Sequence, residues 1–180
     1  MVFIGRFATE KGADLLPDII LDLTENFSDR LSIFILGAGD PAIQARVKML
    51  VDEQIENFDV FFGYDENLAH WLYASADFLL MPSRVEPCGL NQLYAMKYGT
   101  LPIVHSVGGL KDTVIDLENN GYGVGFDTLE VADIRKAIVR AAEYYENRSK
   151  FEDNQHKIMS LDFSWDKSAA KYLNLYNQLI

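Results

Sequence analysis

One carboxylate, Glu86, stands directly before a glycine turn and the start of an expected helix. Pro87 cannot donate a backbone hydrogen bond and Gly89 tolerates unusual dihedral angles, so we expect the chain to turn sharply there. The turn would leave the backbone amides of Leu90 and Asn91 unpaired at a helix N-terminus, where the helix dipole attracts phosphate. Glu86 would then reach hydroxyl groups attached to that phosphate. The segment is a candidate sugar-phosphate site, and the alternative is an ordinary strand-to-helix turn with a surface glutamate.

A second candidate is the loop at residues 5 to 12, which carries Arg6 and Lys11 between an expected strand and an expected helix. Cations beside a helix N-terminus face an unfavourable dipole, and a bound diphosphate would supply the missing negative charge. The alternative is a pair of solvated basic residues with acidic neighbours such as Glu10 and Asp14. Because an acidic protein places both cations at the carboxyl end of a strand, we favour an anion-binding function.

Further glycines follow the next two expected strands. Residues 37 to 42 resemble the Gly-x-Gly-x-x-Gly/Ala fingerprint of dinucleotide-binding proteins. The ribose-binding acid of that fingerprint should close the next strand, yet Asp59 precedes its strand, which ends in Gly63 and Tyr64. We therefore interpret the first glycines as a tight turn beside a nucleotide pocket. Gly63 would leave room for a ligand and Tyr64 would pack on a base, the alternative being a tyrosine that closes the core.

The histidines and the cysteine give little support to a metal site or a nucleophile pair. His70, His105 and His156 are scattered without paired spacing, so we expect ordinary surface or core histidines and no zinc site. Cys88 has no histidine close in sequence. We interpret it as a small side chain in a tight sugar pocket.

Alternating strands and helices must position these candidates. Apolar runs of strand length lie at Val2 to Ile4, Ile33 to Leu36, Val60 to Phe62, Phe78 to Met81, Leu101 to Val104 and Val124 to Phe126. Continuous apolar runs indicate strands buried on both faces, and helical patterns separate them. The alternation predicts an α/β fold with a doubly wound, Rossmann-like parallel sheet, whose ligands bind at the carboxyl ends of the strands.

The pattern after Asp127 is helical and ends in an aromatic segment. We expect the last helix to start near Ser164 and to carry Trp165, Tyr172 and Tyr176 on one stripe. This helix is expected to cover the sheet, with docking on a domain outside the sequence as the alternative. Because no linker or boundary is visible, residues 1–180 are interpreted as one domain.

Composition limits the partners. The 180 residues carry 27 acidic against 16 basic side chains and a net charge of −11, which argues against nucleic acid and anionic membranes as main partners. The single cysteine forms no internal disulfide, and no apolar run approaches the roughly 18 to 20 residues that span a bilayer. We expect a cytoplasmic protein. The sequence opens directly on a strand without a leader, which suggests a piece of a longer chain.

Six motifs in order closely resemble the bacterial glycogen synthases and the plant starch synthases. They are Gly-Arg-x5-Gly at residues 5 to 12, Leu-Gly-Ala-Gly-Asp-Pro at 36 to 41, Pro-Ser-Arg-x-Glu-Pro-Cys-Gly-Leu at 82 to 90, Lys-Tyr-Gly-Thr-x-Pro at 97 to 102, Gly-Gly-Leu-x-Asp-Thr-Val at 108 to 114 and Asp-Phe-Ser-Trp at 162 to 165. That family has the GT-B fold, two Rossmann-like halves around a cleft. The resemblance covers essentially the whole sequence and implies the C-terminal, donor-binding half, with the N-terminal acceptor domain lying outside it.

The resemblance also implies roles for individual residues. Arg6 and Lys11 would neutralise the diphosphate of ADP-glucose, and Glu86 would hold glucose hydroxyls. The other implied contacts are Cys88 and Gly89 at the sugar, the Leu90 and Asn91 amides at phosphate, and Gly63 and Tyr64 at the base. The family extends an α-1,4-glucan at its non-reducing end with retention of configuration, and requires no metal or cofactor.

Two positions depart from the wider pattern. Many retaining GT-B enzymes carry a second glutamate eight residues after the first, whereas this sequence has Tyr94, which suits the glycogen synthase branch. Asn91 stands where close relatives often have threonine, and its amide can still donate to phosphate.

The expected function is therefore the donor-binding half of a glycogen synthase, specific for ADP-glucose or UDP-glucose and inactive alone. The alternatives are a non-catalytic nucleotide or sugar-phosphate sensor on the same scaffold, and a nicotinamide-linked oxidoreductase. Because apolar surface near the cleft would be uncovered, we expect this chain to self-associate.

Overall fold

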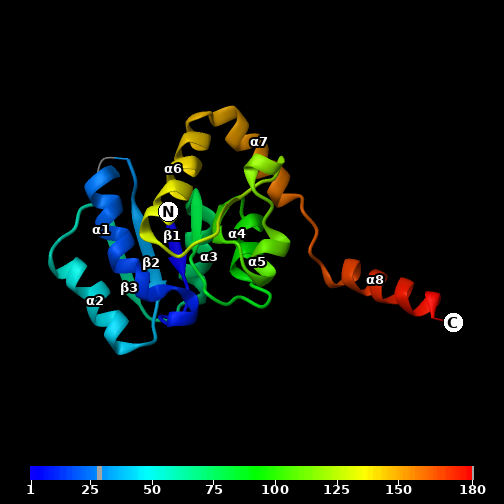
Figure 1. The fold of residues 1–180 in the computed structure, drawn as a ribbon, viewed down its shortest axis with the longest axis horizontal. Coiled ribbons are helices and arrows are strands. Elements are labelled where there is room, and N and C mark those ends of the chain that lie inside the picture. Colours follow the sequence, from blue (N-terminus) through cyan, green and yellow to red (C-terminus); the bar gives the residue numbers. More distant parts are fainter. Residues whose placement is uncertain (28–29, 180) are drawn as a thin grey trace.

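The computed structural model describes residues 1–27 and 30–179, and its centre is a six-stranded sheet with helices on both faces (Figure 1). The strands are β1 (Val2–Ile4), β2 (Ile33–Gly37), β3 (Phe58–Phe62), β4 (Phe78–Met81), β5 (Leu101–His105) and β6 (Val124–Phe126). Their order is β3-β2-β1-β4-β5-β6, and each recorded pairing is parallel. The predicted doubly wound parallel sheet is confirmed. β3 begins two residues before the predicted run, and β2 and β5 each extend one residue beyond it.

Two separate cores lie on the two faces of the sheet. One face is covered by α1 (Leu16–Phe27), α2 (Pro41–Asp52) and α6 (Val131–Glu146), and the other by α3 (Glu66–Ser75), α4 (Asn91–Lys97) and α5 (Gly108–Thr113). α7 (Arg148–Met159) contributes Phe151 to the first core, and its Ile158 forms a small third cluster with Met96 of α4. Neighbouring strand residues enter opposite cores, as Ile35 and Leu36 do in β2. This double coverage explains the continuous apolar runs of β4 and β5, which are buried throughout.

The chain order reverses between β1 and β4. From β1 the chain proceeds outward through β2 to β3, and α3 then returns it to β4 on the other side of β1. The loops that follow β1 and β4 therefore leave neighbouring strands at the point of the sheet where doubly wound folds bind their ligands. The two candidate loops found in the sequence, at residues 5 to 12 and 82 to 90, are these two loops.

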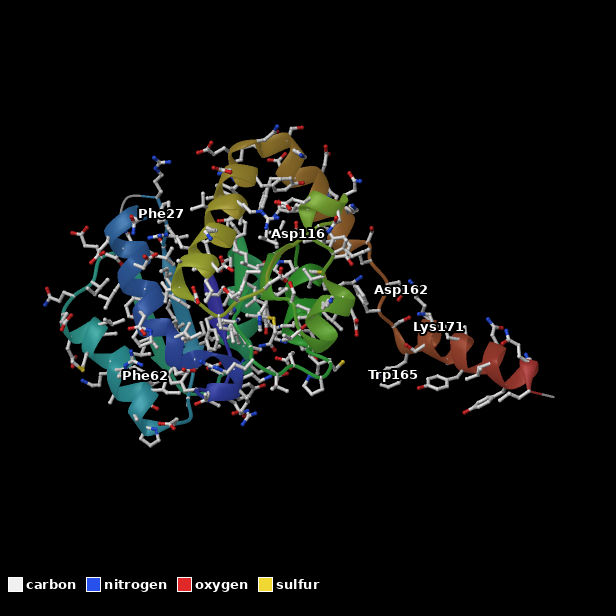
Figure 2. All side chains as sticks on the ribbon, in the orientation of Figure 1. Phe27, Phe62, Asp116, Asp162, Trp165 and Lys171 are labelled. Atoms are coloured by element: carbon white, nitrogen blue, oxygen red, sulfur yellow. The ribbon has the colours of Figure 1, made fainter. Side chains whose placement is uncertain are left out.

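The last helix, α8 (Trp165–Gln178), stands away from the body of the molecule (Figure 1). None of its residues is buried, and Trp165 is 87 % exposed. Its aromatic side chains project into solvent (Figure 2). The prediction that this helix covers the sheet is wrong, because an amphipathic pattern shows that a face is apolar without showing what covers it.

The start of α8 agrees with its motif. The Asp162 carboxylate accepts a hydrogen bond from the Ser164 amide at 2.8 Å, and Ser164 is the N-cap residue of the helix. The Asp-Phe-Ser-Trp motif thus sets where α8 begins. No helix formed by residues 1–27 and 30–179 is long and apolar enough to cross a membrane.

Candidate functional site

A cavity of ≈ 520 Å³ opens at the carboxyl ends of β1, β2 and β3. Four of the predicted site residues line it: Arg6, Gly63, Tyr64 and Asn91. Glu66 on α3 lines it as well, although its position in the sequence gave no signal, and its carboxylate can accept hydrogen bonds from hydroxyl groups. The cavity has the position expected of a ligand site in a doubly wound sheet.

Three tyrosines form one wall of this cavity. Tyr64 is 81 % exposed, so the alternative that it closes the core is wrong. Tyr73 is buried, and its ring centroid lies 6.1 Å from that of Tyr94. Burial raises the pKa of the Tyr73 hydroxyl, and the neighbouring Tyr94 and Tyr64 raise it further, so this group stays protonated at neutral pH. The wall offers apolar ring faces together with hydroxyl groups, which suits a planar ligand.

The glycines at the end of β2 and just beyond it allow close packing against the loop after β1. A Cβ atom on Gly37 would lie 2.2 Å from the Gly5 carbonyl oxygen, and one on Gly39 would lie 2.4 Å from the Phe7 carbonyl oxygen. The loop after β2 can therefore rest against the loop after β1. Asp59 lies inside β3, where its carboxylate accepts a hydrogen bond from the adjacent Val60 amide. It is not at the carboxyl end of the strand, where the nicotinamide fingerprint needs its acid.

Lys11 and Glu86 form a partly buried ion pair across the two candidate loops. The Lys11 Nζ atom lies 2.6 Å from Glu86 Oε2, and the Ser83 hydroxyl donates to the same oxygen at 3.1 Å. Glu86 is only 7 % exposed, so the alternative of a surface glutamate is wrong. Neither residue lines the tyrosine-walled cavity. The residue predicted to bind the sugar, Glu86, and a residue predicted to bind the diphosphate, Lys11, instead contact each other. They lie 75 positions apart in the sequence.

Arg6, unlike Lys11, is paired within its own loop and at the surface. Its guanidinium lies 2.9 Å from Glu10 in an exposed pair within the same loop, which is the acidic neighbour that the alternative interpretation named. Seventy per cent of the Arg6 side chain is exposed, and exposed pairs of this kind contribute little stability. Arg6 is thus free to turn into the cavity.

The two loops are fastened together through Arg84. Its backbone amide donates to the Glu10 carbonyl oxygen at 2.8 Å, and its guanidinium makes two bonds to Asp14, at 2.6 and 2.9 Å. Gly12 has φ +68, and a Cβ atom there would lie 1.9 Å from the Pro82 carbonyl oxygen. Sequence reasoning missed Arg84, because nothing in its spacing identifies Asp14 as its partner.

The turn before α4 exposes Cys88 and Leu90 to solvent and buries Gly89. Cys88 is exposed, Leu90 is 57 % exposed, and no side chain among residues 1–27 and 30–179 caps the start of α4 at Leu90. The amides of the first helical turn therefore have no partner within the helix. α4 has only seven residues, so its dipole is smaller than the sequence argument assumed. The Asn91 side chain donates to the Ile4 carbonyl oxygen at 2.6 Å and joins this turn to the end of β1.

Gln92 is a third residue that sequence reasoning missed, after Glu66 and Arg84. It is fully buried under the turn, and its Nε2 atom donates to the carbonyl oxygens of Cys88 and Gly89 at 3.1 and 3.0 Å. Gly89 has φ +74, and a Cβ atom there would lie 2.4 Å from Gln92 Oε1. Gln92 therefore fixes the direction of two peptide groups in the turn. A glutamine in a short helix carries no signal of this role in the sequence.

Comparison with known proteins assigns this chain to a family. The family described as "Glycosyl transferases group 1" matches residues 1–158. The chain belongs to this family.

Relatives of this glycosyl transferase chain agree with the resemblance seen in the sequence. It is 46 % identical to a glycogen synthase of Flavobacterium johnsoniae over 179 residues, and 41 % identical to a glycogen synthase of Thermodesulfovibrio yellowstonii over 180. These matches cover 99 % and 100 % of the chain but 38 % and 35 % of the two relatives. The chain therefore spans little more than a third of the length of these curated relatives, and the resemblance to glycogen synthases is confirmed.

Solved structures agree in fold. The catalytic domain of starch synthase IV from Arabidopsis thaliana, bound to ADP and acarbose, matches with a TM-score of 0.86 and 32 % identity. The match covers 98 % of this chain and 38 % of that one. The C-terminal domain of a group 1 glycosyl transferase from Francisella tularensis matches with a TM-score of 0.73 at 17 % identity, covering 91 % of this chain and 86 % of that one, which shows a shared fold.

The histidines of this glycosyl transferase chain have structural positions or lie at the surface. His105 is buried with its Nδ1 atom 2.7 Å from the Ser83 carbonyl oxygen, His70 contacts the Tyr98 hydroxyl at 2.8 Å, and His156 is exposed. Within residues 1–27 and 30–179, no three or more His, Cys, Asp or Glu side chains gather as a metal site would require. The expectation that the protein needs no cofactor stays a prediction.

Proposed function

We propose that this chain is the donor-binding half of a glycogen synthase, which transfers glucose from ADP-glucose or UDP-glucose to the non-reducing end of an α-1,4-glucan with retention of configuration. The observation that carries the proposal is the meeting of Lys11 and Glu86 where the loops after β1 and β4 adjoin, beside a cavity that Arg6 and Tyr64 line. The Arabidopsis relative bound to ADP supports ADP-glucose as the donor.

In this proposal Arg6 and Lys11 bind the diphosphate and stabilise the charge that develops on it as the glycosidic bond breaks. Glu86 accepts hydrogen bonds from glucose hydroxyls. Both roles fit the geometry, since Lys11 and Glu86 are already in contact and a donor needs its sugar and its diphosphate recognised side by side.

The remaining predicted residues would surround the two ends of the donor. Cys88 and Gly89 would contact the sugar, and the amides at Leu90 and Asn91 would meet phosphate. Gly63 and Tyr64 would hold the base in the tyrosine-walled cavity, a role supported by the exposed ring of Tyr64 and by its place in the lining.

The acceptor glucan would bind to the part of the protein that lies outside this chain, so the chain alone should not transfer glucose. We place residues 1–180 in one donor-binding domain and the acceptor cleft in a preceding domain. The cytoplasmic location, like the absence of nucleic acid and membrane as partners, stays a prediction.

Calorimetric titration of this chain with ADP, UDP, NAD and ADP-glucose tests the proposal. We expect saturable binding of ADP, tighter binding of ADP-glucose and no binding of NAD. Lys11→Ala should remove most of the ADP affinity, and Glu86→Ala should remove the gain that glucose provides. Lys48→Ala, which breaks an exposed ion pair on α2, is the matched control and should leave all titrations unchanged.

Two outcomes would contradict the proposal. Tighter binding of NAD than of ADP would favour an oxidoreductase. Donor binding by a whole protein that transfers no glucose to glycogen would favour a non-catalytic sensor on the same scaffold.

The uncovered apolar face of α8 supports self-association of this chain. Tyr172 and Leu173 are each 60 % exposed on this helix. Sedimentation velocity should detect dimers or larger species at high protein concentration, and Leu173→Lys should shift them toward monomer. Asn174→Lys adds the same charge beside that face and should have a smaller effect. A wild-type chain that stays monomeric at every concentration would overturn this prediction.

A further inference from the structure

We infer that Glu86 discriminates the sugar nucleotide from the free nucleotide by competing for Lys11. This inference rests on the proposed function and adds a coupling between the two ends of the donor. When no sugar is bound, Glu86 holds the Lys11 ammonium. When glucose hydroxyls donate to Glu86, Lys11 is released to bind the diphosphate.

The ion pair is well formed but solvent can still reach it. Lys11 Nζ lies 2.6 Å from Glu86 Oε2, with 25 % of the lysine side chain and 8 % of the glutamate side chain exposed. The Ser83 hydroxyl donates to the same oxygen at 3.1 Å. The other oxygen, Oε1, receives no recorded hydrogen bond from residues 1–27 or 30–179. It therefore has room to accept from a ligand hydroxyl.

Only the side chains need to move for this exchange. The loop of Lys11 and the loop of Glu86 are joined by backbone bonds from Arg84 and Val85 to the Glu10 carbonyl oxygen, at 2.8 and 3.2 Å. The Glu86 carbonyl oxygen in turn accepts from the Gly109 amide at 2.9 Å. With the backbone fixed on both sides, the Lys11 ammonium can swing on its flexible stem while Glu86 stays in place.

The energetic consequence differs between the two ligands. A diphosphate that draws Lys11 away leaves a carboxylate that is buried and without its cation, and such a charge is costly. A sugar nucleotide offsets this cost, because its hydroxyls donate to the carboxylate at the same time. The sugar and the diphosphate therefore bind cooperatively, and the free nucleotide left after transfer is bound more weakly than the donor.

The test is to titrate ADP and ADP-glucose into the wild-type chain and into Glu86→Gln, which keeps the shape of the side chain and removes its charge. We expect Glu86→Gln to bind ADP about five- to tenfold more tightly than wild type, a typical size for coupling between sites. The ratio of ADP-glucose affinity to ADP affinity should fall by at least the same factor. Glu10→Gln removes the exposed partner of Arg6 and is the matched control, with an expected change below about twofold.

A double-mutant cycle assigns the effect to Lys11. In a Lys11→Met background, Glu86→Gln should no longer tighten ADP binding, because the cation for which it competes is gone. Thermal unfolding of each variant checks that the fold is kept. Cys88, the single cysteine and an exposed one, gives an independent signal: ADP-glucose should slow its alkylation more than ADP does.

Failure of this inference can be distinguished from failure of the proposed function. If ADP binds wild type and Glu86→Gln equally, or binds the variant more weakly, the competition is overturned while the proposed function stands. If neither ADP nor ADP-glucose binds any variant, the proposed function and this inference both fall.

Discussion

The two ends of the candidate site differ in how their side chains are held. At the turn between β4 and α4, Glu86 and Gln92 are buried, and each makes hydrogen bonds or ion pairs with neighbouring elements. At the cavity over β1 and β3, Arg6 and Tyr64 are largely exposed, and the recorded partner of Arg6 is Glu10 in a surface ion pair. The first end is organised before any ligand arrives, whereas the second leaves its side chains free to adjust.

This contrast suits the two parts of a nucleotide sugar. A sugar is recognised by directional hydrogen bonds, which lose strength if the acceptor is misplaced. A base and a diphosphate are recognised by ring faces and by charge, which tolerate adjustment. The contrast predicts that substitutions that disturb the packing of the turn reduce both the stability of the fold and the recognition of the sugar, while those at the cavity reduce nucleotide binding alone.

The largest expected effect is at Gly109, where α5 passes under the turn. A Cβ atom there would lie 1.9 Å from the Cys88 carbonyl oxygen, so Gly109→Ala must displace the backbone. We expect a loss of about 3 kcal/mol in the free energy of unfolding, measured by urea denaturation. Gly5→Ala in the cavity wall is the control, because its Cβ atom would meet Phe3 at an ordinary 3.4 Å and should cost less than about 1 kcal/mol. Equal losses at the two glycines would remove the contrast.

Next is Gln92→Met, which keeps the length of the side chain and removes its donor. The Cys88 and Gly89 carbonyl oxygens would lose their partner, and we expect a loss of about 2 kcal/mol in the free energy of unfolding. The gain in affinity from ADP to ADP-glucose should shrink in the same variant. Gln44→Met on α2, whose side chain has no recorded partner in the described residues, is the control. A variant that loses stability but keeps the full gain would make Gln92 a packing residue only.

Much of this fold was predictable from the sequence, whereas the contacts between the turn before α4 and the neighbouring loops were not. Continuous apolar runs in β4 and β5 indicate strands buried on both faces, because no other common arrangement buries every residue of a strand. Lys11 and Glu86 were each found from local features. Their contact depends on which strands neighbour each other in the sheet, and short motifs carry no information about that.

The position of α8 is a second feature that the local sequence pattern could not predict. The stripe of Trp165, Tyr172 and Tyr176 correctly predicts an amphipathic helix. Hydrophobic periodicity specifies the apolar face, but the surface that covers the face is a property of the whole assembly.

A smaller effect is expected at Tyr64, and in binding alone. Its exposed ring makes little contribution to the core, so Tyr64→Ala should change the free energy of unfolding by less than about 0.5 kcal/mol. Loss of a stacked base should weaken ADP binding by about 1 to 2 kcal/mol, measured by calorimetry. Trp71→Ala removes another exposed aromatic side chain from α3, outside the cavity lining, and should leave ADP affinity unchanged. If both substitutions weaken ADP equally, the base does not lie on Tyr64.

The smallest effect is expected at Arg6. Since its pair with Glu10 is exposed, Arg6→Gln should leave the free energy of unfolding within about 0.5 kcal/mol of wild type. It should weaken ADP binding by about 1 kcal/mol at low salt, and by less as salt rises, because an exposed cation acts on the diphosphate through a screened field. Titrations at several salt concentrations measure this. A loss of ADP affinity that is independent of salt would mean that Arg6 becomes buried against the nucleotide. The cavity would then close on its ligand, and the difference between the cavity and the turn would hold only for the chain without ligand.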